Sequence, residues 1–368
     1  MQIKAAVVRE TSAPFVIETL ELCEPRPDEL IVRVVASGMC QTDLHGRDGY
    51  FAVSHFPAVF GHEGAGVVHA VGSAVREFAP GDHVVMSYPW CGDCANCRRH
   101  RLNYCLNARV LKNRGTRADG STLLAKGDAP VYSAYFQQSS FGTFALTQER
   151  YAVKVRKDAP LELLGPLACS GQTGAGAVFN ALKPNAGESI AVFGVGAVGL
   201  SALAAAKILG CAPIVAIDIH DRRLALAREL GATHTINAAT NPDVVGAIRD
   251  AVDGGVHYTV EATAVPAVLR NAIMALLPGG TCALLGSARS GTEASFEMPF
   301  LQQGRIVRGV VQGDSIPKDF IPKLVDLVVE GKFPIAKMVK FYDLADINQA
   351  ARDSEAGTTI KPVLRMPS

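Results

Sequence analysis

Residues 189–206, SIAVFGVGAVGLSALAAA, constrain the fold more than any other stretch of the chain, because they carry no charged side chain. Their length approaches that of a membrane-spanning helix. However, Gly194, Gly196 and Gly199 cluster in the middle, β-branched residues precede them, and Ala and Leu follow. This order is typical of a buried strand, a tight turn and a buried helix. We therefore predict a strand, turn and helix here, and no membrane span.

The character of the sequence changes near Glu162, and the length of 368 residues favours two domains. Before that point, short β-branched runs separated by Pro, Gly and Asp are typical of a barrel-like β domain. After it, strands alternate with helical runs, as in a parallel sheet with helices on its faces. A predicted helix at 317–332 and a strand at 359–366 could return to the first domain. The sequence predicts a discontinuous β-barrel domain with an inserted, doubly wound α/β domain.

Composition and charge exclude several classes of partner. The formal net charge is +1, and no long block of Lys or Arg occurs, so we expect neither nucleic acid nor a membrane surface as a partner. The first residues contain no secretory signal pattern, and we expect a cytoplasmic protein. In a reducing compartment, the nine cysteines favour metal binding over a disulfide framework. Residues 107–140 are too long for an ordinary connection, and we assign them no structure.

The run GVGAVG at 194–199 matches the G-x-G-x-x-G pattern of dinucleotide-binding folds. The first glycine would form the turn, the second would let the backbone approach a pyrophosphate, and the third would let the helix pack on the sheet. The alternative is that the glycines merely permit close packing. The preceding strand and the following helix favour cofactor binding, and the expected contacts are Gly194, Gly196, Val198 and Gly199.

Asp218 ends the next predicted strand, at about the distance from the glycines where dinucleotide-binding folds place an acidic residue. Its carboxylate would accept hydrogen bonds from the adenosine ribose and repel a 2′-phosphate, which favours NAD over NADP. Arg222 and Arg223 follow closely and could contact a 2′-phosphate. We expect the carboxylate to dominate, and we include Arg223 among the residues that bind the cofactor.

Four cysteines lie close together in CGDCANCRRHRLNYC: Cys91, Cys94, Cys97 and Cys105. Four thiolates saturate the tetrahedral shell of zinc, so such a site is structural rather than catalytic. An iron–sulfur cluster is the main alternative, but the ferredoxin motif continues with three residues, a cysteine and a proline, and this chain does not. A zinc ribbon that reads nucleic acid is disfavoured by the net charge. We predict a structural zinc lobe at about 91–105.

Three further candidate ligands, Cys40, His62 and Cys169, are dispersed along the chain. Their spacing cannot join them in one site. A lone cysteine is commonly a buried apolar residue and a lone histidine is often a satisfied core group, so the residues alone leave both interpretations open. The remaining cysteines are expected to be inert core residues: Cys23, Cys211 and Cys282.

The segment GHEGAG around His62, the four-cysteine segment, GVGAVG and Asp218 together resemble the zinc-dependent medium-chain alcohol dehydrogenases in order and spacing. The resemblance covers essentially the whole chain. It implies a GroES-like catalytic domain at 1–170 and 312–368, and a Rossmann-type NAD-binding domain at 171–311.

The resemblance also implies roles for single residues, which the motifs alone do not establish. The catalytic zinc ligands would be Cys40, His62 and Cys169, the ligand set known for alcohol dehydrogenase, so the chain would hold two zinc ions with NAD. Behind the catalytic metal would lie Glu63 and Asp43. The proton of the alcohol would leave through Thr42, the cofactor ribose and His45 while the hydride passes to NAD. Two positions depart from the family near the cofactor phosphates: Gln41 stands where a basic residue is common, and Lys361 stands where an Arg is frequent. We include Lys361 among the residues that bind the cofactor.

The C-terminal part of the chain, from GDSIPKDFIPKLVDLVVEGKFP to GTTIKPVLRM, most resembles aryl-alcohol (benzyl-alcohol) dehydrogenases. The implied substrates are primary aromatic alcohols or their aldehydes, near the apolar residues Tyr50, Phe51 and Trp90. The alternatives are a dehydrogenase of the same family acting on a polyol, an aliphatic alcohol or a thiol-adduct alcohol, and a non-catalytic binding protein. We expect a homodimer or homotetramer.

Overall fold

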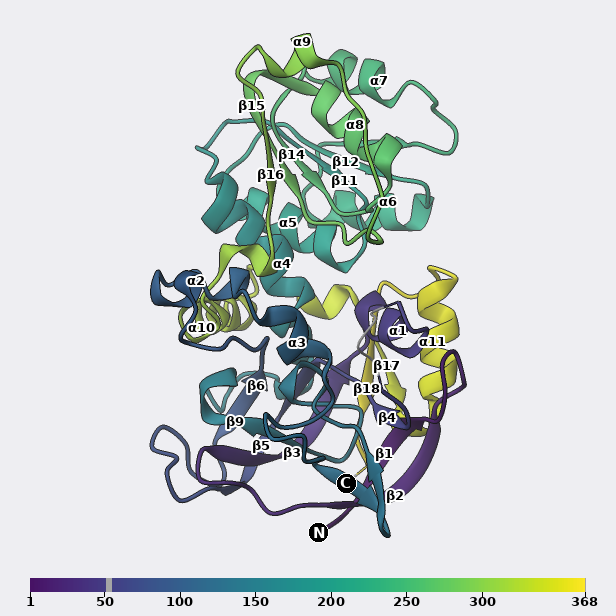
Figure 1. Cartoon of the computed structure of the whole chain (residues 1–368). Coiled ribbons are helices and arrows are strands. Elements are labelled where there is room, and N and C mark those ends of the chain that lie inside the picture. The colour runs from purple at the N-terminus through teal and green to yellow at the C-terminus, as the bar shows by residue number, and fades with distance from the viewer. Residues whose placement is uncertain (51–54, 368) are drawn as a thin grey trace. The chain divides into compact units, whose positions relative to one another are not determined.

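The computed structural model describes residues 1–50 and 55–367 (Figure 1), so Phe51 lies outside the described residues. The chain divides into two compact units. The first unit comprises Met1–Cys169, Ile316–Glu330 and Ile335–Ser368, and the second comprises Ser170–Ser315 and Gly331–Pro334.

The boundaries of the units differ slightly from those that the sequence suggests. Residues 170, 312–315 and 331–334 were expected in the catalytic domain but belong to the second unit. For residues 312–315, the reason is a set of hydrogen bonds to neighbouring helical residues. Ser315 Oγ donates to Gln172 Oε1 at 2.8 Å, and Asn180 Nδ2 donates to the carbonyl of Gly313 at 3.0 Å.

Two sheets form the framework of the first unit. Among the described residues, one sheet has the order β4-β1-β2-β7-β8, and the other has the order β10-β6-β5-β3-β18-β17 with β9 also paired to β3. The strands are β1 (Gln2–Val8), β2 (Val16–Leu22), β3 (Glu29–Gly38), β4 (Ala58–Val59), β5 (Glu63–Val71), β6 (His83–Met86), β7 (Leu124–Lys126), β8 (Ala129–Val131), β9 (Phe144–Gln148), β10 (Ala152–Lys154), β17 (Val339–Asp343) and β18 (Lys361–Arg365).

The last strand brings the C-terminal part of the chain into the first unit. β18 pairs antiparallel with β3, with Val363 opposite Gly38, and parallel with β17. Central strands of this unit are apolar because both of their faces are covered, and β3 is buried along most of its length. Its helices are α1 (Gln41–Arg47), α2 (Ala95–Arg98), α3 (Ala108–Asn113), α10 (Pro317–Val329) and α11 (Ile347–Glu355).

The second unit contains a parallel sheet with the strand order β13-β12-β11-β14-β15-β16. The first strand, β11, lies in the middle of the sheet. The next two strands extend the sheet on one side and the last three on the other, which is the strand order of dinucleotide-binding Rossmann folds. The predicted doubly wound α/β fold is therefore confirmed. The strands are β11 (Ile190–Phe193), β12 (Ile214–Asp218), β13 (His234–Asn237), β14 (Val256–Glu261), β15 (Leu276–Leu284) and β16 (Ile306–Gly309).

The uncharged stretch 189–206 forms β11 and the first part of α5 (Ala197–Ile208). All four residues of β11 are buried, and α5 is buried from Gly199 to Ala206. A helix that is apolar on all sides needs such a buried position. The other helices of this unit are α4 (Ser170–Gly176), α6 (Asp221–Leu230), α7 (Val244–Ala251), α8 (Pro266–Met274) and α9 (Met298–Leu301).

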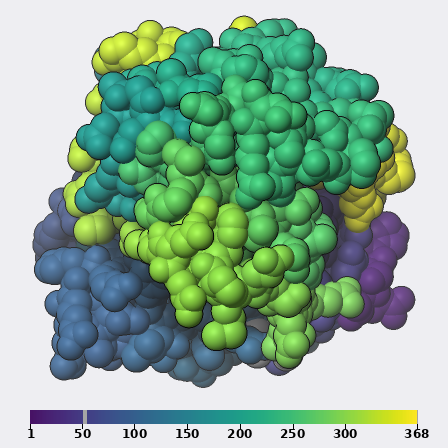
Figure 2. All heavy atoms as spheres, turned by 90° about the horizontal axis from the view of Figure 1, so that it is seen from above, coloured from purple at the N-terminus to yellow at the C-terminus, as the bar shows by residue number. Residues whose placement is uncertain are grey.

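The surface of the second unit includes a long exposed segment. Residues 287–299 are exposed at nearly every position, and the green to yellow-green spheres in Figure 2 show this part of the chain on the surface. Within the described residues, no helix is both long enough and apolar enough to cross a membrane.

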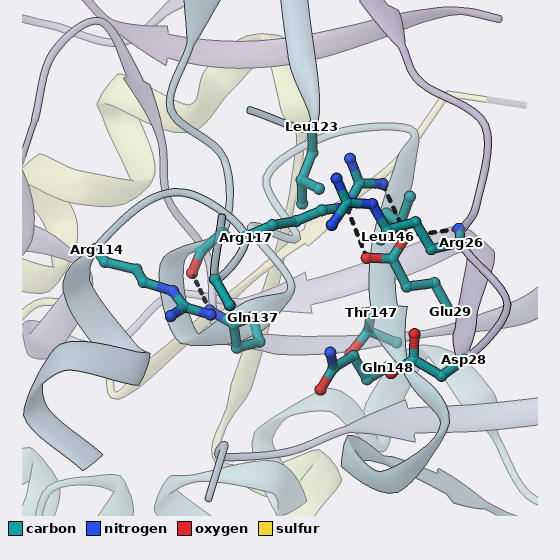
Figure 3. A pocket seen from close by; sticks show the side chains of 12 residues that line it. Arg26, Asp28, Glu29, Arg114, Arg117, Leu123, Gln137, Leu146, Thr147 and Gln148 are labelled. Atoms are coloured by element: carbon teal, nitrogen blue, oxygen red, sulfur yellow. Dashed lines mark hydrogen bonds and ion pairs between the residues drawn. The ribbon is translucent and has the colours of Figure 1, made fainter. Parts of the chain in front are cut away.

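Residues 107–140, which the sequence left without a structure, contain α3, β7, β8 and a short helical turn at Tyr135–Gln137. Arg117 holds part of this region against the barrel. Its guanidinium donates to both carboxylate oxygens of Glu29 at 2.7 Å, and Glu29 also accepts from the backbone N–H of Arg26 at 2.8 Å. Figure 3 shows these groups in a cavity of about 90 Å³. The region is therefore fixed by a buried ion pair.

Candidate metal and cofactor sites

The dispersed residues Cys40, His62, Glu63 and Cys169 form one cluster, in which one ligand atom from each lies within 4.8 Å of the others. Cys40 precedes α1, His62 immediately precedes β5, Glu63 begins that strand, and Cys169 follows a short helical turn. A hydrogen bond from the Cys169 thiol holds the pKa of Cys40 well below its usual range. Two sulfurs and an imidazole at this separation are the donors that zinc prefers.

The Asp43 carboxylate holds His62 and the backbone next to the cluster in place by hydrogen bonds. It is fully buried and accepts from His62 Nδ1 at 2.7 Å, from the backbone N–H of Gly61 at 3.1 Å and from that of Cys40 at 2.9 Å. Burial alone would lower the pKa of His62, but the charges and hydrogen bonds of Asp43 and Cys40 raise it to about 10.

The other ring nitrogen of His62, Nε2, is buried and has no hydrogen-bond partner among the described residues. A buried nitrogen without a partner is costly, whereas a metal ion would use its lone pair. The residues present therefore fit a zinc ion bound by Cys40, His62 and Cys169.

Glu63 lies in the same cluster but is paired with a cation. The Lys361 ammonium donates to its two carboxylate oxygens at 3.0 and 2.9 Å and to the carbonyl of Met39 at 3.2 Å. Burial raises the pKa of Glu63, and Glu63 raises the pKa of Lys361 against the effect of its own burial. The sequence suggested Lys361 as a contact of the cofactor. The structure instead places all three of its N–H donors on groups of the first unit, and a role in binding the cofactor stays a prediction.

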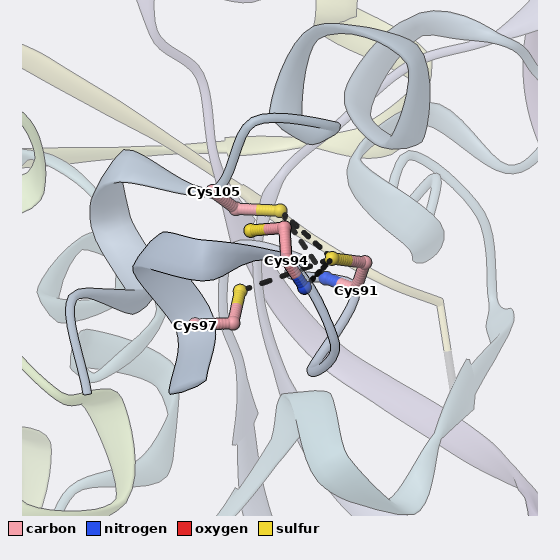
Figure 4. A group of neighbouring side chains, drawn as sticks. All are labelled: Cys91, Cys94, Cys97 and Cys105. Carbon is pink, nitrogen blue, oxygen red and sulfur yellow. Dashed lines mark hydrogen bonds between the residues drawn. The ribbon is translucent and has the colours of Figure 1, made fainter. Parts of the chain in front are cut away.

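The other four cysteines converge in the loop that contains α2, as Figure 4 shows. Cys91 Sγ lies 3.9 Å from Cys97 Sγ and 3.5 Å from Cys105 Sγ. Sulfurs that are each about 2.3 Å from one tetrahedral ion are about 3.8 Å apart. The cysteines are not joined by disulfides.

Backbone N–H groups also point at these sulfurs. The N–H of Cys94 donates to Cys91 Sγ at 3.4 Å, and that of Leu106 donates to Cys94 Sγ at 3.4 Å. Such bonds stabilise thiolate over thiol, and those from Cys97 and Leu106 lower the pKa of Cys94 to about 6. These bonds favour an anionic sulfur at Cys94, whereas burial raises the pKa of Cys97 and of Cys105, so a bound metal ion would be needed to hold all four as thiolates.

The glycines of the 194–199 turn serve two different purposes. Gly194 has a φ of +84°, and a Cβ on Gly199 would lie 2.0 Å from the carbonyl oxygen of Gly194. These two glycines permit the turn and the close packing of α5. Beside Gly196, by contrast, no described atom lies within 4 Å of where a Cβ would stand. Gly196 precedes α5, so its backbone is open to a phosphate at the positive end of that helix.

Asp218 ends β12 next to this turn. One carboxylate oxygen accepts from the backbone N–H of Val195 at 2.9 Å, and the other accepts from those of Ile219 and His220 at 2.8 and 3.0 Å. Arg223 Nη1 lies 3.7 Å from the carboxylate. The carboxylate is thus rigidly held, and the arginine that could attract a 2′-phosphate is drawn toward it.

The proposed relay residues lie on α1, one turn apart. Thr42 Oγ1 is 3.7 Å from Cys40 Sγ, and the carbonyl of Thr42 accepts from the Tyr135 hydroxyl at 2.8 Å. The His45 ring stacks on Tyr50 at 4.1 Å. Trp90 packs edge-on between Tyr88 and Tyr151, in one buried hydrophobic cluster with Tyr135 and Phe136, and its place near the substrate stays a prediction.

Two aromatic residues beside the cluster were missed by sequence reasoning. The rings of Phe136 and Tyr135 lie 4.5 and 6.0 Å from that of His62. They occupy the region 107–140, which shows no hydrophobic periodicity. The only available signal was an aromatic pair in a long polar loop, and such a pair has no specific meaning.

Comparisons with known proteins agree with this geometry. The model of the alcohol dehydrogenase GroES-like domain matches residues 26–157, and that of the zinc-binding dehydrogenase matches residues 197–330. Together with the two clusters, these matches define a zinc-binding oxidoreductase. The geraniol dehydrogenase of Castellaniella defragrans is 42% identical to this chain, over 98% of this chain and 97% of that protein. The chain belongs to the zinc-dependent medium-chain alcohol dehydrogenases.

Solved structures show the same fold. The alcohol dehydrogenase zinc-binding domain protein from Burkholderia ambifaria matches with a TM-score of 0.98 and 51% identity. The benzyl alcohol dehydrogenase from Acinetobacter calcoaceticus matches with a TM-score of 0.95 and 45% identity. Both matches cover 100% of each chain. The predicted family, the GroES-like and Rossmann-type fold, and zinc and a nicotinamide dinucleotide as cofactors are confirmed.

Proposed function

We propose that this alcohol dehydrogenase reversibly oxidises primary aromatic alcohols of the benzyl type to aldehydes, with NAD as the oxidant. The observation that carries the proposal is a group of buried aromatic side chains packed beside the candidate ligand His62. Phe136 and Tyr135 contact the imidazole, and Phe60 packs edge-on against Tyr135 at 5.0 Å. The 45% identity to a benzyl alcohol dehydrogenase is a second, independent support.

Different residues of the chain would act in different parts of the reaction. When bound, zinc stabilises the alkoxide form of an alcohol and NAD accepts the hydride. Asp43 fixes the tautomer and orientation of His62, so that Nε2 is available as a ligand together with Cys40 and Cys169. Thr42 Oγ1 would accept the proton of the alcohol as it gives up its own, and His45, one helical turn further on, would take up the released proton and pass it to solvent.

We also propose a preference for NAD over NADP. Asp218 supports it, because its buried carboxylate would meet the ribose hydroxyls and repel a phosphate. Arg223 is already close to this carboxylate and is less available to a phosphate. The expected preference in kcat/KM is at least about tenfold, measured with both cofactors at a saturating alcohol concentration. Equal values would contradict the assignment of Asp218.

A second candidate substrate class has its own support. The 42% identical relative is named a geraniol dehydrogenase, which favours an extended aliphatic alcohol in place of an aromatic one. Both classes need an apolar pocket, whereas a polyol needs a polar one.

The experiment compares benzyl alcohol, geraniol, ethanol and glycerol by the absorbance of NADH, before and after treatment with a chelator. Burying a phenyl ring removes on the order of 100 Å² of apolar surface from water, which is roughly 2.5 kcal/mol or about seventyfold in rate. Conjugation with the developing carbonyl adds to this, so benzyl alcohol should exceed ethanol about a hundredfold in kcat/KM. A ratio near one would refute the aromatic assignment and leave the zinc and hydride chemistry intact.

The proposed homodimer or homotetramer has support in the second unit. β16 is the edge strand of its sheet and has no strand partner on its outer side among the described residues. Ile306 on this strand is 53% exposed, and an apolar edge of this kind favours association. Light scattering should give at least a dimer, and Ile306→Lys should shift it toward monomer.

A further inference from the structure

Lys112 lies near the candidate catalytic cluster, and the reaction described above gives it no function. It is a half-buried residue of α3, between the buried residues Leu111 and Asn113. Its ammonium stands over the ring of Phe136, 5.2 Å from the centroid, and the same ring lies 4.5 Å from that of His62. A single aromatic ring therefore separates this cation from a candidate zinc ligand.

This placement is held by the surrounding backbone. Gln137 Nε2 donates to the carbonyl of Leu111 at 2.9 Å and so ties α3 to the turn that carries Phe136. Phe136 and Gln137 both have left-handed backbone angles, with φ of +50° and +57°. Such angles cost about 1 to 3 kcal/mol each in residues other than glycine, and persist only where the surrounding structure enforces them. The geometry of Lys112 and Phe136 is thus imposed rather than incidental.

The Lys112 ammonium lacks an anionic partner. In the parts of the chain that the structure describes, it takes part in no hydrogen bond or ion pair, and its one specific contact is the face of Phe136. An ammonium has three N–H donors, which an aromatic face does not saturate. Burial lowers the pKa of Lys112, and the thiols of Cys169 and Cys105 oppose that effect. The charges that oppose burial are therefore thiolates that lack hydrogen bonds to the ammonium, and no carboxylate of the described residues pairs with it.

Several other cations over rings or in the interior are paired with carboxylates, whereas Arg305, over the ring of Phe300, donates only to carbonyl and amide oxygens. Lys361 is bound to Glu63, and Arg117 is bound to Glu29. Lys154 offers the best comparison, because its ammonium also stands over a phenyl ring, that of Phe78 at 5.4 Å, but lies 2.8 Å from the Asp82 carboxylate. Lys112 has the same contact with a ring and lacks the carboxylate.

We propose that the missing carboxylate comes from the substrate: Lys112 binds an alcohol or aldehyde that carries a carboxylate at the far end of its ring. This inference rests on the proposed function, which supplies the aromatic alcohol. In 4-(hydroxymethyl)benzoate the hydroxyl and the carboxylate lie about 7 Å apart, from ordinary bond lengths. The two distances to the Phe136 ring, 4.5 and 5.2 Å, place the ammonium no more than about 10 Å from the centre of the His62 ring. A molecule of this span, with a hydrogen bond of about 3 Å at its carboxylate, is long enough to extend from the cluster to Lys112.

The test compares kcat/KM for 4-(hydroxymethyl)benzoate and for benzyl alcohol in the wild type, Lys112→Met, Lys112→Arg and the control Lys154→Met. A hydrogen bond to a charged group changes affinity roughly 10- to 100-fold. We expect Lys112→Met to lower kcat/KM for the carboxylated alcohol by that factor, mainly through a higher KM. The kcat/KM for benzyl alcohol should change by less than about twofold. Lys112→Arg should restore most of the preference, and Lys154→Met should leave both substrates unaffected.

Binding of benzoate to the zinc-loaded protein, measured by calorimetry, gives a second readout that needs no turnover. The same loss of affinity is expected in Lys112→Met. The proposal would be overturned if Lys112→Met left unchanged both the ratio of kcat/KM for the two substrates and the affinity for benzoate. An equal loss on both substrates with a lower zinc content would also overturn it, because Lys112 would then only offset the negative charge of the four-cysteine lobe. If the wild type oxidises neither alcohol, the proposed function fails, and benzoate binding alone decides the role of Lys112.

Discussion

Replacing Asp43 by Asn should separate the two metal sites of this protein. The carboxylate is buried and accepts three hydrogen bonds: from His62 Nδ1, from Gly61 N and from Cys40 N. An asparagine of the same shape has one acceptor oxygen. If that oxygen keeps the bonds of Oδ1 to His62 and Gly61, the NH2 group faces the Cys40 N–H, and a buried donor meets another donor.

The magnitude follows from these contacts. A buried donor without an acceptor costs about 1 to 3 kcal/mol, so the free energy of unfolding should fall by that amount. The lost negative charge also makes His62 a weaker ligand, and groups in the position of Asp43 are worth about 10- to 100-fold in metal affinity. The four-cysteine lobe does not contact Asp43, and its affinity for zinc should not change.

The assay is a competition titration with a chromogenic zinc chelator. The wild type should release two zinc ions per chain in two steps. In Asp43→Asn, only the zinc of the catalytic site should be released at a lower chelator concentration. Asp48→Asn is the matched control, since Asp48 pairs with Arg47 at the exposed end of the same helix. If both zinc ions of Asp43→Asn titrate as in the wild type, Asp43 does not support the metal and the reasoning is wrong.

The other predictions concern single steps of the same chemistry. Cys97→Ser should leave one zinc ion per chain and lower Tm by roughly 5 °C or more, because metal binding is coupled to folding. Cys169→Ser should instead abolish turnover with little change in Tm, and a reversal of these two results in calorimetry would contradict the assignment of the sites. Asp218→Asn should reduce the ratio of kcat/KM for NAD over NADP about tenfold or more; an unchanged ratio would exclude Asp218 as the discriminating group. His45→Gln should slow alcohol oxidation near pH 7 and recover at high pH, where solvent base replaces the relay, and an unchanged pH profile would remove His45 from the mechanism.

Local patterns allowed much of this structure to be predicted from the sequence. The glycine turn and the four-cysteine lobe each lie within a short stretch, so residue spacing alone carries the geometry. The alternation of strands and helices likewise predicted the parallel sheet of the second unit, because buried strands and helices have different lengths and compositions.

Contacts between distant segments could not be predicted in this way. Cys40, His62 and Cys169 meet only because three separate elements converge, and the family resemblance, not their spacing, suggested the set. The contact of Lys361 with Glu63 depends on the register of β18 against β3, which has no signature in the sequence. Tyr135 and Phe136 were missed because left-handed backbone angles, rather than a repeating pattern, orient the turn that carries them.

The pairing of Lys361 with Glu63 has a consequence for the order in which the protein is made. Synthesis proceeds from the N-terminus, and domains begin to fold as they emerge from the ribosome. The segment up to Cys169 contains Glu63 and all the candidate zinc ligands, but its neutralising cation is translated almost two hundred residues later. A buried carboxylate without its partner costs about 3 to 5 kcal/mol. The nascent barrel must therefore wait in an open or protonated form, and only the final strand completes its catalytic centre.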